Sequence, residues 1–240
     1  MKPFIGEVFE TNNCGKCTVI DYIDKNNVKV RFENGYVTFC AAGNLRKGNV
    51  RNPFIPVLFN VGFSGEGSFS YTSHKKIFRA WGDMLTRCYS ETFHSKQPTY
   101  LGCTVDERWH NFQNFAADYL QMTGSDLDWQ LDKDLLVRKN KIYSNETCCL
   151  LPHALNMAIQ YESRNEFEPG VYTVRDKFTA NIQINGKNKN LGTFLLEHEA
   201  GLKYKSVKED YVKELSNKFK DLLDPKVYNA LINWEVVLTG

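Results

Sequence analysis

The spacing of apolar residues changes twice along this chain of 240 residues, so one repeated pattern cannot describe it. Short runs that alternate apolar and polar residues fill residues 1–55, helical spacing dominates residues 68–165, and alternation returns in residues 169–240 before another helical stretch. A period of two residues is typical of half-buried strands, and spacings of three and four residues are typical of helices. The sequence therefore predicts an α+β protein with three domains.

The N-terminal segment, residues 1–55, is predicted to form a small antiparallel β-barrel. Its alternating runs are separated by turns rich in Asn, Asp and Gly. The pair Asn34-Gly35 suits a tight hairpin turn, because both central residues of such a turn need positive φ. Several short strands in so few residues favour a strongly bent sheet that closes on itself. Residues 56–67 contain Pro and several Gly, which marks a linker.

Residues 68–165 are predicted to be a mainly helical domain. Apolar residues recur at helical spacing in residues 74–88 and again in residues 109–119. The segment 129–134 then has the pattern of a strand, and a polar loop follows it. A short helix is expected to begin near Pro152, because proline is favoured in the first turn of a helix.

Residues 169–240 are predicted to form three strands followed by a long helix. In the middle strand, residues 178–184, the apolar side chains can cover the helix, whereas Thr179, Asn181 and Gln183 point the other way. The sheet would therefore keep a face of amides and hydroxyls beside several basic residues. A twisted sheet can enter the major groove, about 12 Å wide, where amides and Arg pair with base edges. The same pattern also suits an ordinary solvated sheet face.

The C-terminal segment resembles the APETALA2-type DNA-binding domain. The matching motifs, in order, are Gly170-Val171-Tyr172, Ala180-x-Ile182, Gly186-Lys187, Leu191-Gly192-Thr193-Phe194, Glu199-Ala200 and Tyr204. In that family a three-stranded sheet lies in the major groove and a helix packs behind it; Phe178 stands where the family usually has Trp. The resemblance implies double-stranded DNA as the partner. It also implies these contact residues: Arg175, Lys177, Thr179, Asn181, Gln183, Lys187 and Lys189.

Metal-capable side chains gather in the strand–loop–helix region of the central segment. Asp132 and Asp134 end the predicted strand, and His153 and Asn156 lie on the short helix. A hard cation such as Mg²⁺ takes carboxylate or amide oxygens, and Asp134 with Asn156 or His153 could supply them. Such an ion would stabilise phosphate charge during strand cleavage while a base activates water. The alternative is a solvated strand end and a histidine on a helix surface.

This region resembles the ββα-metal HNH nucleases of phages and other mobile elements, several of which end in an APETALA2-type domain. Two upstream motifs are similar to those of such phage proteins, namely Trp81-x-x-Met84-Leu85-x-Arg87-Cys88-Tyr89 and Arg108-Trp109-x-x-Phe112-x-x-Phe115. The resemblance implies Asp134 and Asn156 as Mg²⁺ ligands, and Asp132, Lys133 and His153 as catalytic positions. Lys133 departs from the family, which usually has a His there as general base. A lysine of ordinary pKa, about 10.4, is a poor base at neutral pH but a good partner for phosphate.

Two functions follow from these resemblances. The first is a metal-dependent, HNH-like homing endonuclease that binds DNA and cleaves it at a recognised site. The second is a catalytically inactive nucleic-acid-binding regulator or anti-host factor on the same scaffold, with structured RNA as an alternative ligand. The N-terminal barrel could contact phosphates or recruit a host protein. By resemblance, the protein is expected in the cytoplasm of an infected bacterial cell.

Charge, hydropathy and cysteine content further limit the classes of protein to which this chain can belong. The net charge of +2 is too small to predict a nucleic-acid binder by itself, and no run approaches the roughly 18 apolar residues of a membrane span. Seven Cys, an odd number, favour a reducing compartment over a disulfide framework. Cys14 and Cys17 have the spacing of half a zinc site, but Cys40 alone lies near them in sequence, so zinc is not expected.

Overall fold

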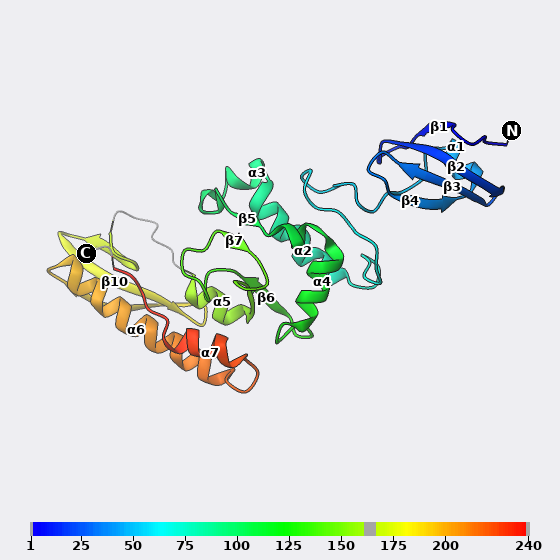
Figure 1. The fold of residues 1–240 in the computed structure, drawn as a ribbon. Coiled ribbons are helices and arrows are strands. Elements are labelled where there is room, and N and C mark those ends of the chain that lie inside the picture. The colour runs from blue at the N-terminus through cyan, green and yellow to red at the C-terminus, as the bar shows by residue number, and fades with distance from the viewer. Residues whose placement is uncertain (1, 161–166, 239–240) are drawn as a thin grey trace. The chain divides into compact units, whose positions relative to one another are not determined.

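The computed structural model describes residues 2–160 and 167–238 and confirms a mixed α+β architecture (Figure 1). The chain divides into two compact units. The first contains residues 1–95 and 107–116, and the second contains residues 96–106 and 117–240. Among the described helices, none combines the length and the apolar character that crossing a bilayer requires.

The N-terminal part of the first unit is a four-stranded antiparallel sheet in the order β1-β2-β3-β4. Its elements are β1 (Val8–Glu10), β2 (Lys16–Asp24), β3 (Asn27–Phe32), β4 (Val37–Cys40) and the short helix α1 (Ala42–Arg46). Val19, Val28 and Val30 point to one side of the sheet and are buried together with Leu45 of α1. The predicted antiparallel strands are thus confirmed. In the described residues the ladder does not join β1 to β4, so closure into a barrel is not seen.

The rest of the first unit is helical. It contains α2 (Lys75–Tyr89), α3 (Glu91–His94), the 3₁₀ helix η2 (Glu107–His110) and the start of α4 (Phe112–Gln121). Trp81 donates from Nε1 to the carbonyl oxygen of Trp109 over 2.7 Å, and its ring packs against Phe78 and Phe112. The two helices expected at residues 74–88 and 109–119 are therefore present, and a buried aromatic cluster holds them together.

The second unit begins with two small two-stranded sheets and a short helix. After η1 (Pro98–Tyr100), β5 (Thr104–Val105) pairs in parallel with β7 (Ile142–Tyr143). Strand β6 (Trp129–Asp132) pairs antiparallel with β8 (Cys149–Pro152), and α5 (His153–Ile159) follows directly. The predicted strand near Trp129 and the helix that starts after Pro152 are both confirmed.

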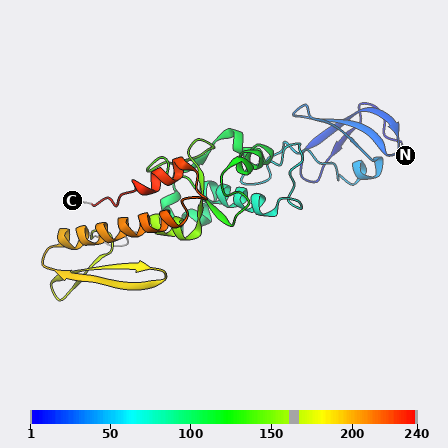
Figure 2. The same ribbon diagram turned by 90° about the horizontal axis from the view of Figure 1, so that it is seen from below.

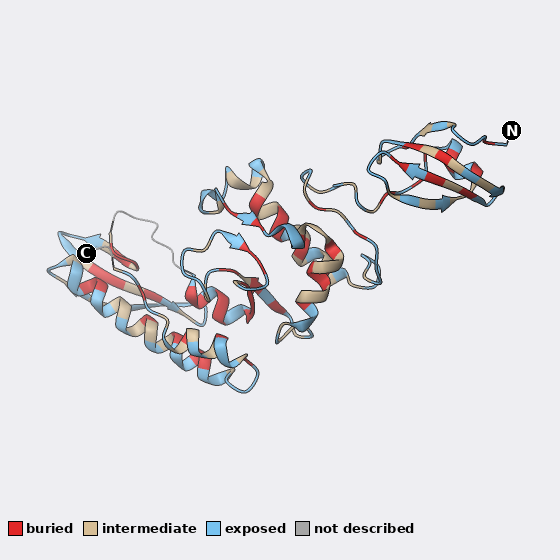
Figure 3. Ribbon diagram, viewed as in Figure 1, coloured by how far each residue is buried: buried red, intermediate tan, exposed pale blue. Residues whose placement is uncertain are grey.

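The C-terminal part of the second unit is a three-stranded antiparallel sheet covered on one face by a long helix, as Figure 2 shows. The elements are β9 (Val171–Val174), β10 (Lys177–Ile184), β11 (Lys187–Phe194), α6 (Glu197–Lys218) and α7 (Pro225–Ile232). Val171 and Ala180 of the sheet are buried against Ala200 of α6. Figure 3 shows buried positions on both the sheet and the helix. The small side chains at this contact let the helix lie close to the central strand.

Candidate functional site

The face of the C-terminal sheet opposite α6 is the candidate DNA-binding surface. In antiparallel strands, residues directly opposite each other point to the same side of the sheet. Thr179 of β10 lies opposite Tyr172 of β9 and Thr193 of β11, so these three share the open face. Lys177 and Val174 are opposite each other on the same face, and both are exposed.

The pairing of β10 with β11, which a β-bulge interrupts, shows which other side chains reach this face. Ala180 pairs with Gly192, but Asn181 pairs with Asn190, so Leu191 is an extra residue. Beyond the bulge, Gln183 lies opposite Asn188. The open face therefore carries four amides from two strands, which are Asn181, Gln183, Asn188 and Asn190.

Asn188 and Asn190 were missed by the sequence analysis, although the chain carries a signal for them. The signal is the turn at Asn185-Gly186, where both residues have positive φ, 51° and 73°. This two-residue turn sets Lys187 opposite Ile184, and alternation from there brings Asn188 and Asn190 to the open face. The bulge comes later in β11, where the side-chain oxygen of Asn190 accepts a hydrogen bond from the Gly192 backbone N–H over 2.8 Å.

Two predicted contact residues, Lys187 and Lys189, lie on the other side of β11 from the amides. Lys189 lies opposite Ile182, which is buried beneath α6, and Lys187 lies opposite Ile184. Both lysines are exposed, but they point to the α6 side of the edge strand rather than to the amide face.

Thr179, another predicted contact residue, is only 3% exposed. Its Oγ1 lies 3.1 Å from Oγ1 of Thr193, and either hydroxyl can be the donor. Thr179 therefore presents no free hydroxyl on the open face.

The remaining predicted contacts lie where DNA could reach them. Arg175 and Asp176 have positive φ, 47° and 64°, and form the two-residue turn between β9 and β10. Asn181 donates from Nδ2 to the Tyr172 hydroxyl over 3.0 Å. Its Oδ1 is buried and has no hydrogen-bond partner in the described part of the chain. Gln183 is exposed.

In the central region, Lys133 is the residue that organises the loop after β6. It is 6% exposed, and its Nζ donates to both carboxylate oxygens of Asp134, over 2.6 and 2.7 Å. The same ammonium donates to the carbonyl oxygen of Asn140 over 2.8 Å, and Nδ2 of Asn140 donates back to the Lys133 carbonyl oxygen over 3.0 Å. We call this reciprocal arrangement the Lys133 clasp. It closes the loop between β6 and β7 with an internal cation.

Asp132 has a different environment from Asp134. One of its carboxylate oxygens accepts the backbone N–H groups of Asp134 and Leu135, over 3.0 and 2.8 Å. Burial raises the pKa of Asp132 even though these hydrogen bonds oppose the shift. The neighbouring thiol of Cys148 is also buried, which raises its pKa to about 12 and keeps it protonated at neutral pH.

The two predicted site residues of α5, His153 and Asn156, form no hydrogen bond with the residues of the Lys133 clasp in the described part of the chain. His153 is exposed at the start of the helix. Asn156 is buried and donates from Nδ2 to Oε1 of Gln130 over 2.7 Å, which ties α5 to β6. Within residues 2–160 and 167–238, no hydrogen bond or ion pair joins His153 or Asn156 to Asp132 or Asp134.

The donor set as arranged does not fit Mg²⁺. This ion demands near-octahedral oxygen ligands, and both oxygens of Asp134 are already bound by the Lys133 ammonium. An ion there would have to displace a buried cation. No cluster of three or more His, Cys, Asp or Glu side chains suited to a metal occurs in the described part of the chain.

In the N-terminal sheet, burial raises the pKa of Cys17 to about 11.

Comparisons with known proteins give no relative from which these roles could be transferred. No protein-family model matches the sequence, and searches of curated proteins and of solved structures likewise find no match.

The Lys133 clasp generates a stability prediction. Replacing Lys133 with Met removes the donor to Asn140 and to Asp134, so the free energy of unfolding should fall by about 1–3 kcal/mol. Lys139→Met is the matched control, because Lys139 lies in the same loop but is exposed. Urea unfolding of both variants measures the difference. Equal, small losses in the two variants would show that the clasp contributes nothing to stability.

The raised pKa of Asp132 generates a pH prediction. When an acid has a higher pKa in the folded than in the unfolded state, folding takes up protons, and stability falls as pH rises from the unfolded value through the folded one. Asp132→Asn keeps an acceptor oxygen for the two backbone donors but cannot ionise. Its stability relative to the parent chain should therefore be greater at about pH 7.5 than at about pH 4. Urea unfolding at both pH values tests this, and a difference that does not change with pH would contradict it.

Proposed function

We propose that this protein binds double-stranded DNA through the amide face of the C-terminal sheet. The observation that carries the proposal is the register of β10 and β11, which brings Asn181, Gln183, Asn188 and Asn190 to one uncovered face. Asn and Gln side chains can donate and accept at once, which suits them to base edges in the major groove.

Shape and charge support the same conclusion. Neighbouring strands lie about 4.8 Å apart, so two strands with their side chains match a groove about 12 Å wide. Arg175 at the turn and Lys177 at the start of β10 add positive charge at one end of the face. Such cations contact phosphates and fix the position of a protein on the duplex, while the amides discriminate between bases.

The finer parts of this proposal rest on sequence resemblance. The C-terminal unit would be of APETALA2 type, the N-terminal sheet would belong to a small barrel, and the protein would act in the cytoplasm of an infected bacterium as a regulator or anti-host factor. The binding of structured RNA is an alternative that competition with duplex DNA would separate.

The register of the C-terminal sheet predicts that Lys177 and Lys189, which lie on opposite sides of it, contribute differently to DNA binding. Lys177→Gln should weaken binding and lower the slope of log affinity against log salt concentration by about 1, because one phosphate contact is lost. Lys189→Gln removes the same charge on the α6 side and should change the slope much less. Fluorescence anisotropy with a duplex selected from a random library measures both. Equal slopes in the two variants would contradict the assignment of the face.

In the same assay, Gln183→Ala should lower the preference for the selected duplex over a scrambled one about tenfold or more.

DNA cleavage is the second candidate function, and the order β6, β8 and α5 favours it because a hairpin followed by a helix is the ββα arrangement. The Lys133 clasp favours binding alone. We therefore expect supercoiled plasmid to stay intact with Mg²⁺, with Mn²⁺ and with EDTA, while the chain binds it in all three. Metal-dependent nicking that is lost in Asp134→Ala, with affinity kept, would establish the nuclease instead.

A further inference from the structure

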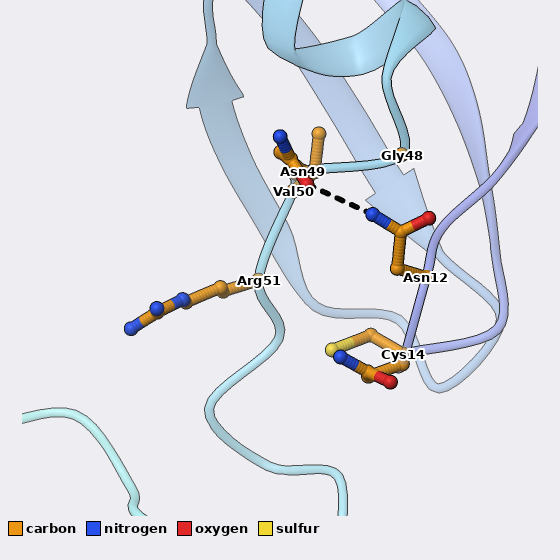
Figure 4. A pocket seen from close by; sticks show the side chains of 7 residues that line it. Asn12, Cys14, Gly48, Asn49, Val50 and Arg51 are labelled. Atoms are coloured by element: carbon orange, nitrogen blue, oxygen red, sulfur yellow. Dashed lines mark hydrogen bonds between the residues drawn. The ribbon is translucent and has the colours of Figure 1, made fainter.

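The first unit contains a polar cavity that is separate from the residues discussed above. Its volume is about 290 Å³, and it lies between two loops, residues 12–14 and 48–51 (Figure 4). Its lining includes three asparagines, Asn12, Asn13 and Asn49, and Arg51, whose side chain points away from Asn12 (Figure 4). The first loop joins β1 to β2, and the second follows α1.

The wall of this cavity is preformed. Asn12 donates from Nδ2 to Oδ1 of Asn49 over 2.8 Å and to the carbonyl oxygen of Lys47 over 3.1 Å (Figure 4 shows the first of these). The Asn12 backbone N–H also donates to the Gly48 carbonyl oxygen over 3.0 Å. Gly48 has a φ of +69°, and a Cβ there would lie 2.8 Å from Oδ1 of Asn12, so glycine permits this close approach. A ligand would therefore cost little ordering of the two loops.

Basic residues outnumber acidic ones around the two loops, although Glu10 lies directly opposite Lys16 in the pairing of β1 with β2. Lys16 follows the first loop, and Arg46, Lys47 and Arg51 belong to the second, whereas residues 34–65 contain no Asp or Glu. In the described part of the chain, no salt bridge or hydrogen bond engages these four cationic side chains. Glu33 is a carboxylate near the first loop, 3.7 Å from a Cβ built on Gly15. The excess of free cations attracts an anion.

We propose that this cavity binds a phosphate ester, either one nucleotide unit of a single-stranded nucleic acid or a free nucleotide. Arg51 has a planar fork of donors that matches phosphate oxygens, and the asparagines can donate to and accept from a base or sugar. The volume lies at the small end of ligand pockets. It admits one nucleotide unit but no duplex, so the site differs in its ligand from the amide face of the C-terminal sheet and does not depend on that proposal.

A site-resolved titration tests the inference. The full chain, labelled with ¹⁵N, is titrated separately with thymidine 5′-monophosphate, single-stranded hexathymidylate and inorganic phosphate. We expect saturable shifts of the Gly48, Asn49 and Arg51 backbone amides with the nucleotide probes. Arg51→Gln should weaken the affinity for the nucleotide probes about tenfold or more, because a charged hydrogen-bond donor is lost. Lys25→Gln removes one charge from the turn between β2 and β3 and should leave this affinity unchanged.

The outcomes separate the sources of the phosphate. Tighter binding of hexathymidylate than of the mononucleotide identifies a nucleic-acid strand as the ligand, and equal binding identifies a free nucleotide. If inorganic phosphate binds as tightly as both, the amides make no contact with base or sugar and the nucleotide assignment is overturned. Absence of saturable shifts at these three amides, or equal binding by Arg51→Gln, overturns the site itself. Shifts confined to Gln183 and Asn188 would report the amide face alone.

Discussion

The contact of α6 with one face of the C-terminal sheet determines what this part of the molecule can bind. Ala180 and Ala200 are fully buried where the helix crosses the central strand, and the larger apolar side chains pack around them. Because one face is consumed by this core, any ligand of the sheet must use the other. The register of the strands then fixes which side chains that face offers, and the two-residue turn at Asn185-Gly186 brings Asn188 and Asn190 onto it.

In the central region, a buried cation occupies a carboxylate that could otherwise bind a metal ion. Asp132 and Asp134 lie within two positions of each other, at a strand end where metal ligands are common. Yet the ammonium of Lys133 already binds both oxygens of Asp134, and the backbone satisfies Asp132. The Lys133 side chain is buried whereas Asp134 is exposed, so the ammonium needs an acceptor inside the loop, and the Asn140 carbonyl oxygen provides it. The region thus holds its loop together without any further ion.

Periodicity predicted most of the secondary structure but not the side-chain environments that decide function. Spacing alone located β10, α2, β6 and α5, because each of these elements has one buried face. It did not predict β8, whose four residues are all buried and show no alternation. It also could not foresee the Lys133 clasp, because Asn140 is seven positions away along an irregular loop and helical or strand spacing says nothing about such pairs.

The amide face and the N-terminal cavity, the two proposed binding sites, differ in how much positive charge lies near them. Affinity for nucleic acid comes mainly from phosphate contacts, and the amide face has only Arg175 and Lys177 close to it in sequence. Amides discriminate between bases but add little binding free energy in water, because they exchange one set of hydrogen bonds for another. The N-terminal cavity differs in charge, because Lys16, Arg46, Lys47 and Arg51 lie in or beside the two loops that carry its three asparagines. If both proposed sites bind one nucleic acid that has duplex and single-stranded parts, covalent linkage makes the second contact intramolecular, so two weak sites can give tight binding.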